Sequence, residues 1–331
     1  MTKEFSFTFA SEPFEQWLEK NPDVEKLALS GNMSSGEIES FEDAVLQSKI
    51  RILHLDEIVL SEHQQENERD YEEYIFDELC LNFSQLSWFV KCFINRKRVD
   101  AFILDDDCVY SEDRKSLIHV PEMENYVLPD TVEYIGIAAF SGYDELHNFK
   151  FNQSLKEIGA YAFYDCYELE NIELPDSLTT LGKSAFCGAG IEKLKLSNNL
   201  IAVPDECFLN NDLERLTIPS SVKEIGDESF GGNCIEKMLI PEGVEKIGYF
   251  VFERLKYISL PSTLKEIAPD FYYEEFVDAG EYPPYVRVHP DNPIFYAKAG
   301  TLYYKDNDKQ VLNSPYRDMV LPIFRQVLIL D

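Results

Sequence analysis

Basic and aromatic side chains recur at regular intervals through the second half of this sequence. They are Lys150, Lys193, Lys195, Arg215, Lys237 and Tyr257. Lysine and arginine form charge-assisted hydrogen bonds with acidic groups, and a tyrosine ring offers an apolar surface with a polar tip. Residues of these types, set one repeat apart, can receive an extended acidic segment of a protein or a glycan.

The elements that must position these residues are short strands with the pattern L-x-x-L-x-L, whose third and fifth residues point away from the core. In six such strands, these twelve positions hold five basic residues and one acidic residue. The surrounding block, residues 127–272, holds 24 acidic and 12 basic residues, so the charge is inverted on this one face. We therefore predict a binding surface, expected to be concave, along the exposed side of the strands.

The regular spacing of these lysines also has an alternative explanation, in which they form surface ion pairs and bind no ligand. Glutamates occupy the second strand position in four repeats, at Glu170, Glu192, Glu214 and Glu236. Exposed ion pairs between these glutamates and the neighbouring lysine column would each be worth only about 0–1 kcal/mol. The basic residues would then form a solvated surface and no binding site.

Each strand belongs to a longer repeat that reads L-P-x-x-L-x-x-I-G-x-x-A-F before the strand begins. The aromatic position recurs every 20–23 residues, at Phe140, Phe163, Phe186, Phe208, Phe230, Phe252 and Tyr272. We interpret these rings as an interior stack, because rings that recur at a fixed phase are usually core residues. The glycine four residues before most of the rings is expected to adopt a positive φ.

One unit of about 22 residues cannot bury its apolar face alone, so neighbouring units must stack into a continuous core. The sequence thus predicts an α/β repeat solenoid. We expect a leucine-rich-repeat-like, right-handed coil of short parallel strands, turns and short helices, with inserted β-hairpins. Six rungs of such a coil would span roughly 24 Å.

The repeats resemble the BspA-like leucine-rich repeats, most clearly over residues 155–174 and 222–240. The sequence departs from that pattern where Asn152 and Ser197 replace the proline and where Pro204 replaces the glycine. The resemblance implies a protein-recognition scaffold, often on a bacterial surface, with no catalytic residues to carry over.

We expect four parts in the chain. Residues 1–100 form an N-terminal cap with irregular rungs and an acidic loop near residues 56–78, and residues 101–121 form a β-hairpin. Residues 122–272 form the regular repeats, and residues 273–331 form a loop, a second hairpin and a partial rung. The apolar, strand-prone C-terminal end would leave an open sheet edge, which suggests self-association.

Within the cap, short helices are expected near residues 11–18, with Ser11 as the N-cap, and near residues 37–46. Strand-like phrases cover residues 24–29 and 50–55. An apolar cluster at residues 83–94 is interpreted as packing, and the basic run that follows it as a helix end.

The formal net charge of −31 argues against nucleic acid and anionic membranes as partners. No stretch is apolar enough to span a membrane, and the given sequence begins without a signal-peptide pattern, so as written the chain is expected to be soluble and cytoplasmic. The family resemblance instead suggests the cell surface or secretion. Seven cysteines without a C-x-x-C pair predict buried free thiols and no zinc site.

The triplet Asp105–Asp107 is interpreted as solvated, so we expect neither metal nor cofactor. No sequence motif of an enzyme family occurs. The predicted function is a non-enzymatic protein-recognition or adhesion scaffold that binds a protein or glycan through its strands. An intracellular structural scaffold is the alternative, and an enzyme is the least favoured class.

Overall fold

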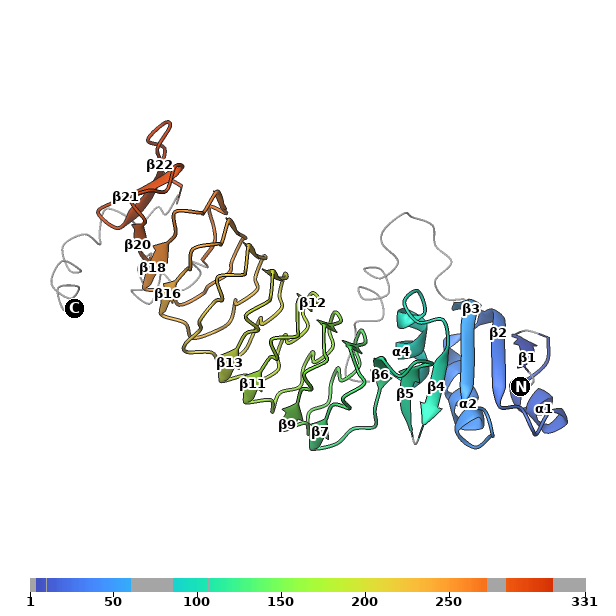
Figure 1. The fold of residues 1–331 in the computed structure, drawn as a ribbon. Helices are drawn as coiled ribbons and strands as arrows, with labels where there is room; N and C mark the ends of the chain where they lie inside the picture. The colour runs from blue at the N-terminus through green and yellow to red at the C-terminus, as the bar shows by residue number, and fades with distance from the viewer. Residues whose placement is uncertain (1–3, 10, 61–85, 106, 273–283, 312–331) are drawn as a thin grey trace.

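A computed structural model describes residues 4–9, 11–60, 86–105, 107–272 and 284–311. The molecule is elongated, with an N-terminal unit of strands and helices followed by a long array of stacked rungs (Figure 1). Two apolar clusters form the core, one inside the N-terminal unit and one running through the array. The predicted repeat solenoid is confirmed, but its described rungs are built from strands and turns, and the described helices all lie in the N-terminal unit. The expected division at residues 100, 121 and 272 stays a prediction.

The N-terminal unit alternates strands and helices. Its elements are β1 (Glu4–Thr8), α1 (Phe14–Lys20), β2 (Lys26–Met33), α2 (Ser35–Leu46), β3 (Ile52–Leu60) and α4 (Trp88–Asn95). Strands β1, β2 and β3 are parallel neighbours. Both expected helices are present, although α1 begins after Pro13, and Ser11 donates to the carbonyl of Thr8 and does not cap the helix.

Strand β3 extends through Leu60, so the expected acidic loop cannot begin at residue 56. The remainder of that acidic run lies outside the described residues. The basic residues after the apolar cluster do mark a helix end, because α4 ends at Asn95 and the guanidinium of Arg96 donates to the carbonyl of Phe93 at 2.7 Å.

Three antiparallel strands join the N-terminal unit to the array. They are β4 (Phe102–Asp105), β5 (Cys108–Ser111) and β6 (Ser116–His119), and the expected hairpin is the pair β5 and β6. Strand β4 was not expected. Asp105 is the last residue of β4, whereas Asp107 has φ 64° and lies in a turn directly before β5, so these two aspartates do not continue one strand.

The rungs of the array carry short strands on two sides, except that no strand forms at residues 215–217 (Figure 1). One side carries β7 (Asn125–Val127), β9 (Asn148–Lys150), β11 (Asn171–Glu173), β13 (Lys193–Lys195), β16 (Lys237–Leu239) and β18 (Tyr257–Leu260). The other side carries β8 (Tyr134–Ile135), β10 (Glu157–Ile158), β12 (Thr180–Leu181), β14 (Ala202–Val203), β15 (Glu224–Ile225), β17 (Lys246–Ile247) and β19 (Glu266–Ile267). Strands β8, β10 and β12 continue the sheet of the N-terminal unit, which gives nine strands in the order β1-β2-β3-β4-β5-β6-β8-β10-β12.

The predicted ring stack fills the array. Phe140, Phe163, Phe186, Phe208, Phe230 and Phe252 are each at most 1% exposed. Successive rings are stacked and nearly parallel, with interplanar angles of 1–6° and centroid separations of 4.9–6.2 Å. Tyr272 forms a parallel bridge with Phe252, as its place in the column predicts.

The expected positive φ at the glycine column is wrong. The positive φ angles fall two residues later in each rung, for example at Ser184 (51°) and Glu228 (54°). The glycines are needed for close approach between rungs: a Cβ on Gly182 would lie 2.2 Å from the main-chain nitrogen of Ala160. A positive φ and close approach between rungs can each require glycine. At this position only close approach requires it.

Two of the departures from the repeat pattern make buried hydrogen bonds. The Asn152 amide donates to the carbonyls of Pro129 and Val132 in the preceding rung, at 2.5 and 2.8 Å. The hydroxyl of Ser197 donates to the carbonyl of Leu178 at 2.6 Å. These polar side chains tie adjacent turns together where a proline would otherwise end the strand.

The described C-terminal part adds a rung that sequence analysis missed. Strand β20 (Tyr285–Val288) is parallel to β18, and Tyr285 pairs with Tyr257. The second hairpin is formed by β21 (Phe295–Lys298) and β22 (Thr301–Tyr304). After β22 the chain returns, and Tyr303 and Gln310 form a single antiparallel bridge. The apolar end proposed for self-association, residues 320–330, lies outside the described residues.

Native thiols are expected to react slowly. Cys92, Cys166, Cys187 and Cys207 are buried, Cys108 and Cys234 are partly exposed, and all six are free. Burial raises the pKa of Cys166 and of Cys187 to about 12, so little reactive thiolate forms near neutral pH. Thiol titration should find at most two fast-reacting groups among these six in the native protein and all six after denaturation. Fast labelling of Cys166 in the native state would contradict this packing.

Candidate recognition face

Two columns of side chains run along one side of the array, and we call them together the strand face. The first column is Asn125, Asn148, Asn171, Lys193, Arg215, Lys237, Tyr257 and Tyr285. The second is Val127, Lys150, Glu173, Lys195, Thr217, Leu239, Ser259 and Arg287. The alternation of the strands turns both columns outward, while the residue between them packs inward.

The structure places all the predicted site residues on this face. Lys150, Lys193, Lys195, Arg215 and Lys237 are exposed, and Tyr257 is half-buried. The ammonium of Lys237 lies 5.6 Å from the centroid of the Tyr257 ring. The Tyr257 ring in turn stacks on Tyr285, with centroids 6.2 Å apart and planes 7° apart. Repetition therefore brings residues from separate repeats into one continuous line.

The ion-pair explanation of the lysine column can now be compared with the contacts. In the described part of the chain, Lys195 pairs with Glu173 at 3.7 Å, and no carboxylate pairs with Lys193, Arg215 or Lys237. Glu236, which would have to neutralise Lys237, pairs instead with Lys256 of the next rung. Three adjacent cations of the first column are therefore not neutralised by the second-position glutamates.

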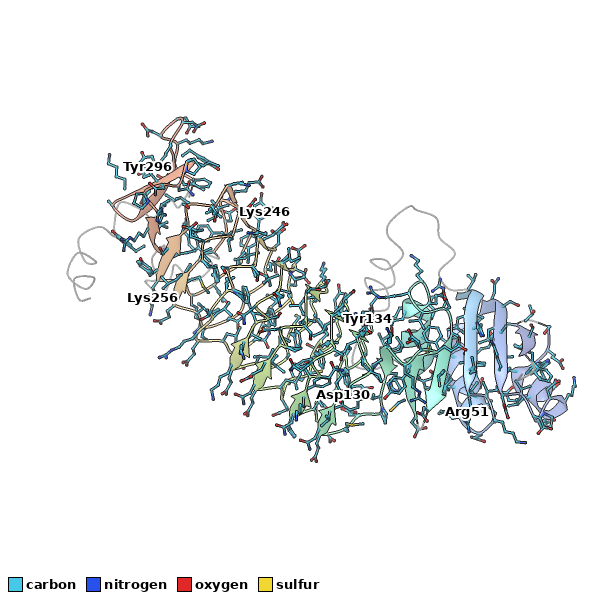
Figure 2. All side chains as sticks on the ribbon, viewed as in Figure 1. Arg51, Asp130, Tyr134, Lys246, Lys256 and Tyr296 are labelled. Atoms are coloured by element: carbon cyan, nitrogen blue, oxygen red, sulfur yellow. The ribbon has the colours of Figure 1, made fainter. Side chains whose placement is uncertain are left out.

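On the opposite side of the array, lysines and glutamates of neighbouring rungs form ion pairs. There Glu133 bridges Lys115 and Lys156 across three rungs, and the two ammonium groups lower its pKa to about 2. Further along, Lys246 pairs with Glu224 at 2.5 Å. Figure 2 shows Lys246 and Lys256 on opposite sides of the array. Cross-rung pairs thus occur on both sides, but on the strand side they involve Lys195 and Lys256 and, within the described residues, leave Lys193, Arg215 and Lys237 without a carboxylate.

The expected concave shape is not observed. The molecule bends where the N-terminal unit meets the array, and strands β7 to β18 follow the outer side of that bend (Figure 1). Most rungs have extended strands on both sides, and paired strands stack at a similar spacing of about 4.8 Å. The array is therefore not forced to curve toward the strand face, and a ligand would lie along an open surface.

Sequence analysis missed both ends of this face. Asn148 donates from its amide to the Asn125 amide oxygen at 2.7 Å, which begins an asparagine ladder before the cations. Tyr285 and Arg287 extend the two columns at the far end. The alternating phrase Tyr-Val-Arg-Val before His289-Pro290 was the available signal for that last strand.

A buried lysine lies at the junction between the N-terminal unit and the array. Lys91, on α4, is 1% exposed, and its ammonium donates to the carbonyl of Ala139 at 3.0 Å and to the Tyr143 hydroxyl at 3.3 Å. Tyr143 also contacts His119 Nδ1 at 3.2 Å. Desolvation lowers the pKa of Lys91 to about 7. A lone lysine in the apolar run Trp-Phe-Val-Lys-Cys-Phe was the sequence signal for this group.

This lysine predicts a pH dependence of stability. The unfolded chain binds the Lys91 proton below pH 10.5, whereas the folded protein binds it only below about pH 7. Unfolding therefore takes up a proton at Lys91 between these values, so this group alone should raise the free energy of unfolding by about 2 kcal/mol between pH 7 and pH 9, measured as the difference between wild type and Lys91→Met because the buried thiols titrate in the opposite sense. Urea unfolding of Lys91→Met should lack this rise, while Lys298→Met, at an exposed site, should keep it. Parallel profiles for wild type and Lys91→Met would refute the assignment.

No metal or membrane chemistry emerges from the described residues. Within these ranges, no group of three or more His, Cys, Asp or Glu side chains could hold a metal ion. Asp105 of the aspartate triplet instead pairs with Arg114 at 2.7 Å. No helix in the same ranges is long and apolar enough to cross a membrane.

The repeats match a known family. The model of the BspA type Leucine rich repeat region matches in six copies, over residues 115–236 and 224–278. The chain therefore belongs, through its repeat array, to the BspA-type leucine-rich-repeat proteins. Membership of this family supports an interaction or adhesion scaffold in general and specifies no partner.

Several solved bacterial leucine-rich-repeat structures are similar at low identity. A leucine-rich repeat protein of Bacteroides ovatus is 18% identical over 49% of this chain and 63% of its own, with a TM-score of 0.29. A leucine rich cell surface protein of Faecalibacterium prausnitzii is 16% identical over 50% and 70%, with a TM-score of 0.32. The pneumococcal vaccine antigen PcpA is 20% identical over 60% and 48%, with a TM-score of 0.34. The chain thus spans less than two thirds of the Bacteroides protein, and no curated protein matches it significantly.

Proposed function

We propose that this protein is a non-enzymatic recognition or adhesion scaffold whose strand face binds a protein or glycan partner. The observation that supports this most is a set of three exposed cations on neighbouring rungs, Lys193, Arg215 and Lys237, that have no carboxylate partner among the described residues of a strongly acidic chain. Such cations attract an acidic ligand and raise the rate of encounter. The half-buried Tyr257 beside them provides an aromatic anchor of the kind that dominates binding energy.

The rigidity of the array suits this role. The outward residues alternate with inward ones such as Ile172, Met238 and Ile258, each at most 1% exposed. Because the backbone is fixed by that packing, the face is organised before a partner arrives, and less conformational entropy is lost on binding.

Charge reversal tests the proposal. The variant Lys193→Glu, Arg215→Glu, Lys237→Glu should capture the partner of the wild-type bait at least tenfold less efficiently, from matrix proteins or from cell lysate. Its melting temperature should stay nearly unchanged, because all three side chains are exposed.

A matched variant controls for net charge. Lys223, Lys246 and Lys298 are exposed and lie outside the strand face, so reversing them changes the charge equally. This control should capture the partner as well as wild type does. Equal loss in both triple variants, or full capture by the strand-face variant, would contradict binding at this face.

A further inference from the structure

Helix α4 packs against the first regular rung of the array, the rung that contains Phe140, on the side where every later rung has a preceding rung. We infer that α4 is an end cap that completes this first rung in place of a preceding one. Two of its side chains, Lys91 and Asn95, take hydrogen-bonding positions that a preceding rung supplies elsewhere. Both are 1% exposed, so their polar groups must find partners within the protein.

Strand β6 supplies one part of the substitute rung. Gly136 donates its N–H to the Leu117 carbonyl at 2.7 Å, and one repeat later Gly159 donates to the Ile135 carbonyl at 2.8 Å. Strand β6 is therefore in the register of a preceding rung. The sequence after β6 lacks the Ala-Phe pair of the repeat, because Pro-Glu stands at residues 121–122. Another element must supply the turn that this pair forms in later rungs.

Within the array, the carbonyls of each turn accept hydrogen bonds from the turn of the preceding rung. The N–H of Ala138 donates to the Ala160 carbonyl at 3.0 Å, and the N–H of Phe140 donates to the Ala162 carbonyl at 2.8 Å. A first rung without such donors would leave two main-chain carbonyls unpaired inside the protein, which is costly.

Helix α4 donates to the equivalent carbonyls of the first rung. These carbonyls belong to Ile137 and Ala139, one repeat before the acceptors of the second rung. The Asn95 amide donates to the Ile137 carbonyl at 3.2 Å, and the Lys91 ammonium donates to the Ala139 carbonyl at 3.0 Å. Because residues four apart lie on the same face of a helix, these two side chains can replace two main-chain N–H groups of a rung.

The oxygen of the Asn95 side chain follows a second pattern of the array. Asp205 Oδ1 accepts from the N–H of Asp227, and Asp227 Oδ1 accepts from the N–H of Tyr249, each at 2.8 Å and each from the next rung. Asn95 Oδ1 accepts in the same way from the N–H of Ile137, at 3.0 Å, and Ile137 has the equivalent position in the repeat. A carboxylate could only accept here, whereas an amide can also donate to the Ile137 carbonyl.

The glycine column gives a further match. A Cβ added to Gly226 would lie 2.4 Å from Asp205 Oδ1, and a Cβ added to Gly136 would lie 3.1 Å from Asn95 Oδ1. Relative to the rung that it covers, the Asn95 oxygen therefore lies where an aspartate oxygen of a preceding rung lies in the regular array. While α4 is in place, no further rung, from this chain or from a second copy, can stack on this end.

Amide hydrogen exchange of the whole protein, measured residue by residue, tests the inference. In the wild type, the Ile137 amide should be protected to within about tenfold of the Asp227 and Tyr249 amides, because all three donate to an equivalent side-chain oxygen. Asn95→Leu should speed exchange at Ile137 by about tenfold or more and leave the other two within about twofold. The control Asn199→Leu removes an exposed bond from a side-chain amide to the Asp176 carbonyl and should leave all three amides unchanged.

Two results would overturn the inference. An Ile137 amide that exchanges in the wild type as fast as in an unstructured peptide would do so without any variant having to fold. In Asn95→Leu, unchanged exchange at Ile137, or equal acceleration at Ile137, Asp227 and Tyr249, would show that Asn95 does not act at this end of the array. None of these residues belongs to the strand face, so the outcome is independent of the proposed function.

Discussion

Replacing Phe208 by alanine is expected to lower the free energy of unfolding by about 3–5 kcal/mol. The ring is fully buried and stacks on Phe186 and Phe230 at 5.4 and 5.5 Å, so its removal breaks two contacts and leaves a cavity at the centre of the array. The rung of Phe208 has no strand at residues 215–217, but main-chain hydrogen bonds from Phe186 to the Cys207 carbonyl and from Phe208 to the Ser229 carbonyl, at 2.8 and 2.9 Å, still join it to both neighbours. Urea unfolding followed by far-ultraviolet circular dichroism measures the change.

Tyr249 provides the control for this substitution. It is aromatic and belongs to the same array but is 48% exposed, so Tyr249→Ala should change stability by no more than about 0.5 kcal/mol. Equal effects of the two substitutions would mean that the ring stack does not stabilise the array.

Gly182→Ala is the second substitution with a large expected effect. The added Cβ would lie 2.2 Å from the nitrogen and 2.5 Å from the Cα of Ala160, and backbone atoms cannot move aside as a flexible side chain can. Two rungs must separate, which weakens the hydrogen bond from Gly182 to the Ile158 carbonyl at 2.8 Å. We expect a loss of about 3 kcal/mol, at the upper end of typical overpacking costs.

The glycine in α2 gives an opposite result for the same chemical change. A Cβ on Gly36 would meet nothing within 4 Å. Gly36→Ala should therefore stabilise the protein by about 0.5–1 kcal/mol, since alanine favours a helix. Thermal melts of both variants check the pair. A tolerated alanine at position 182 would show that the rungs are less closely packed than described.

The features that repeat once per rung could be predicted from the sequence. The phenylalanine stack and the outward cations follow from period and alternation alone, because equivalent positions of stacked units must lie in line. The predicted buried free thiols are found at four of the six described cysteines, for example at Cys166, whose thiol donates to the Phe140 carbonyl at 3.0 Å.

Features that depend on the contacts between neighbouring rungs could not be predicted from the sequence. Gly182 could have been selected by its φ or by close approach, and the sequence does not distinguish the two. The shape of the strand face depends on the relative spacing of its two sides, which no single repeat encodes. Strand β20 was missed because its first residue, Tyr285, follows Tyr257 after an interval longer than the regular period.

The N-terminal unit was interpreted as irregular rungs because residues 24–29 and 50–55 end like repeat strands. The observed strands β2 and β3 are longer, with 8 and 9 residues, and α2 lies between them. These strands bury a second apolar cluster, to which Ile118 and Ala138 from the beginning of the array also contribute.

The central claim is that partners bind on the strand face, and lysine footprinting tests it most directly. The wild-type protein is acetylated briefly, alone and in complex with its captured partner, and labelling is quantified by mass spectrometry. The account predicts a several-fold loss of labelling at Lys193, Lys195 and Lys237 in the complex, with Lys223, Lys246 and Lys298 unchanged. Protection of the second set with full labelling of the first would place the partner elsewhere and contradict the account.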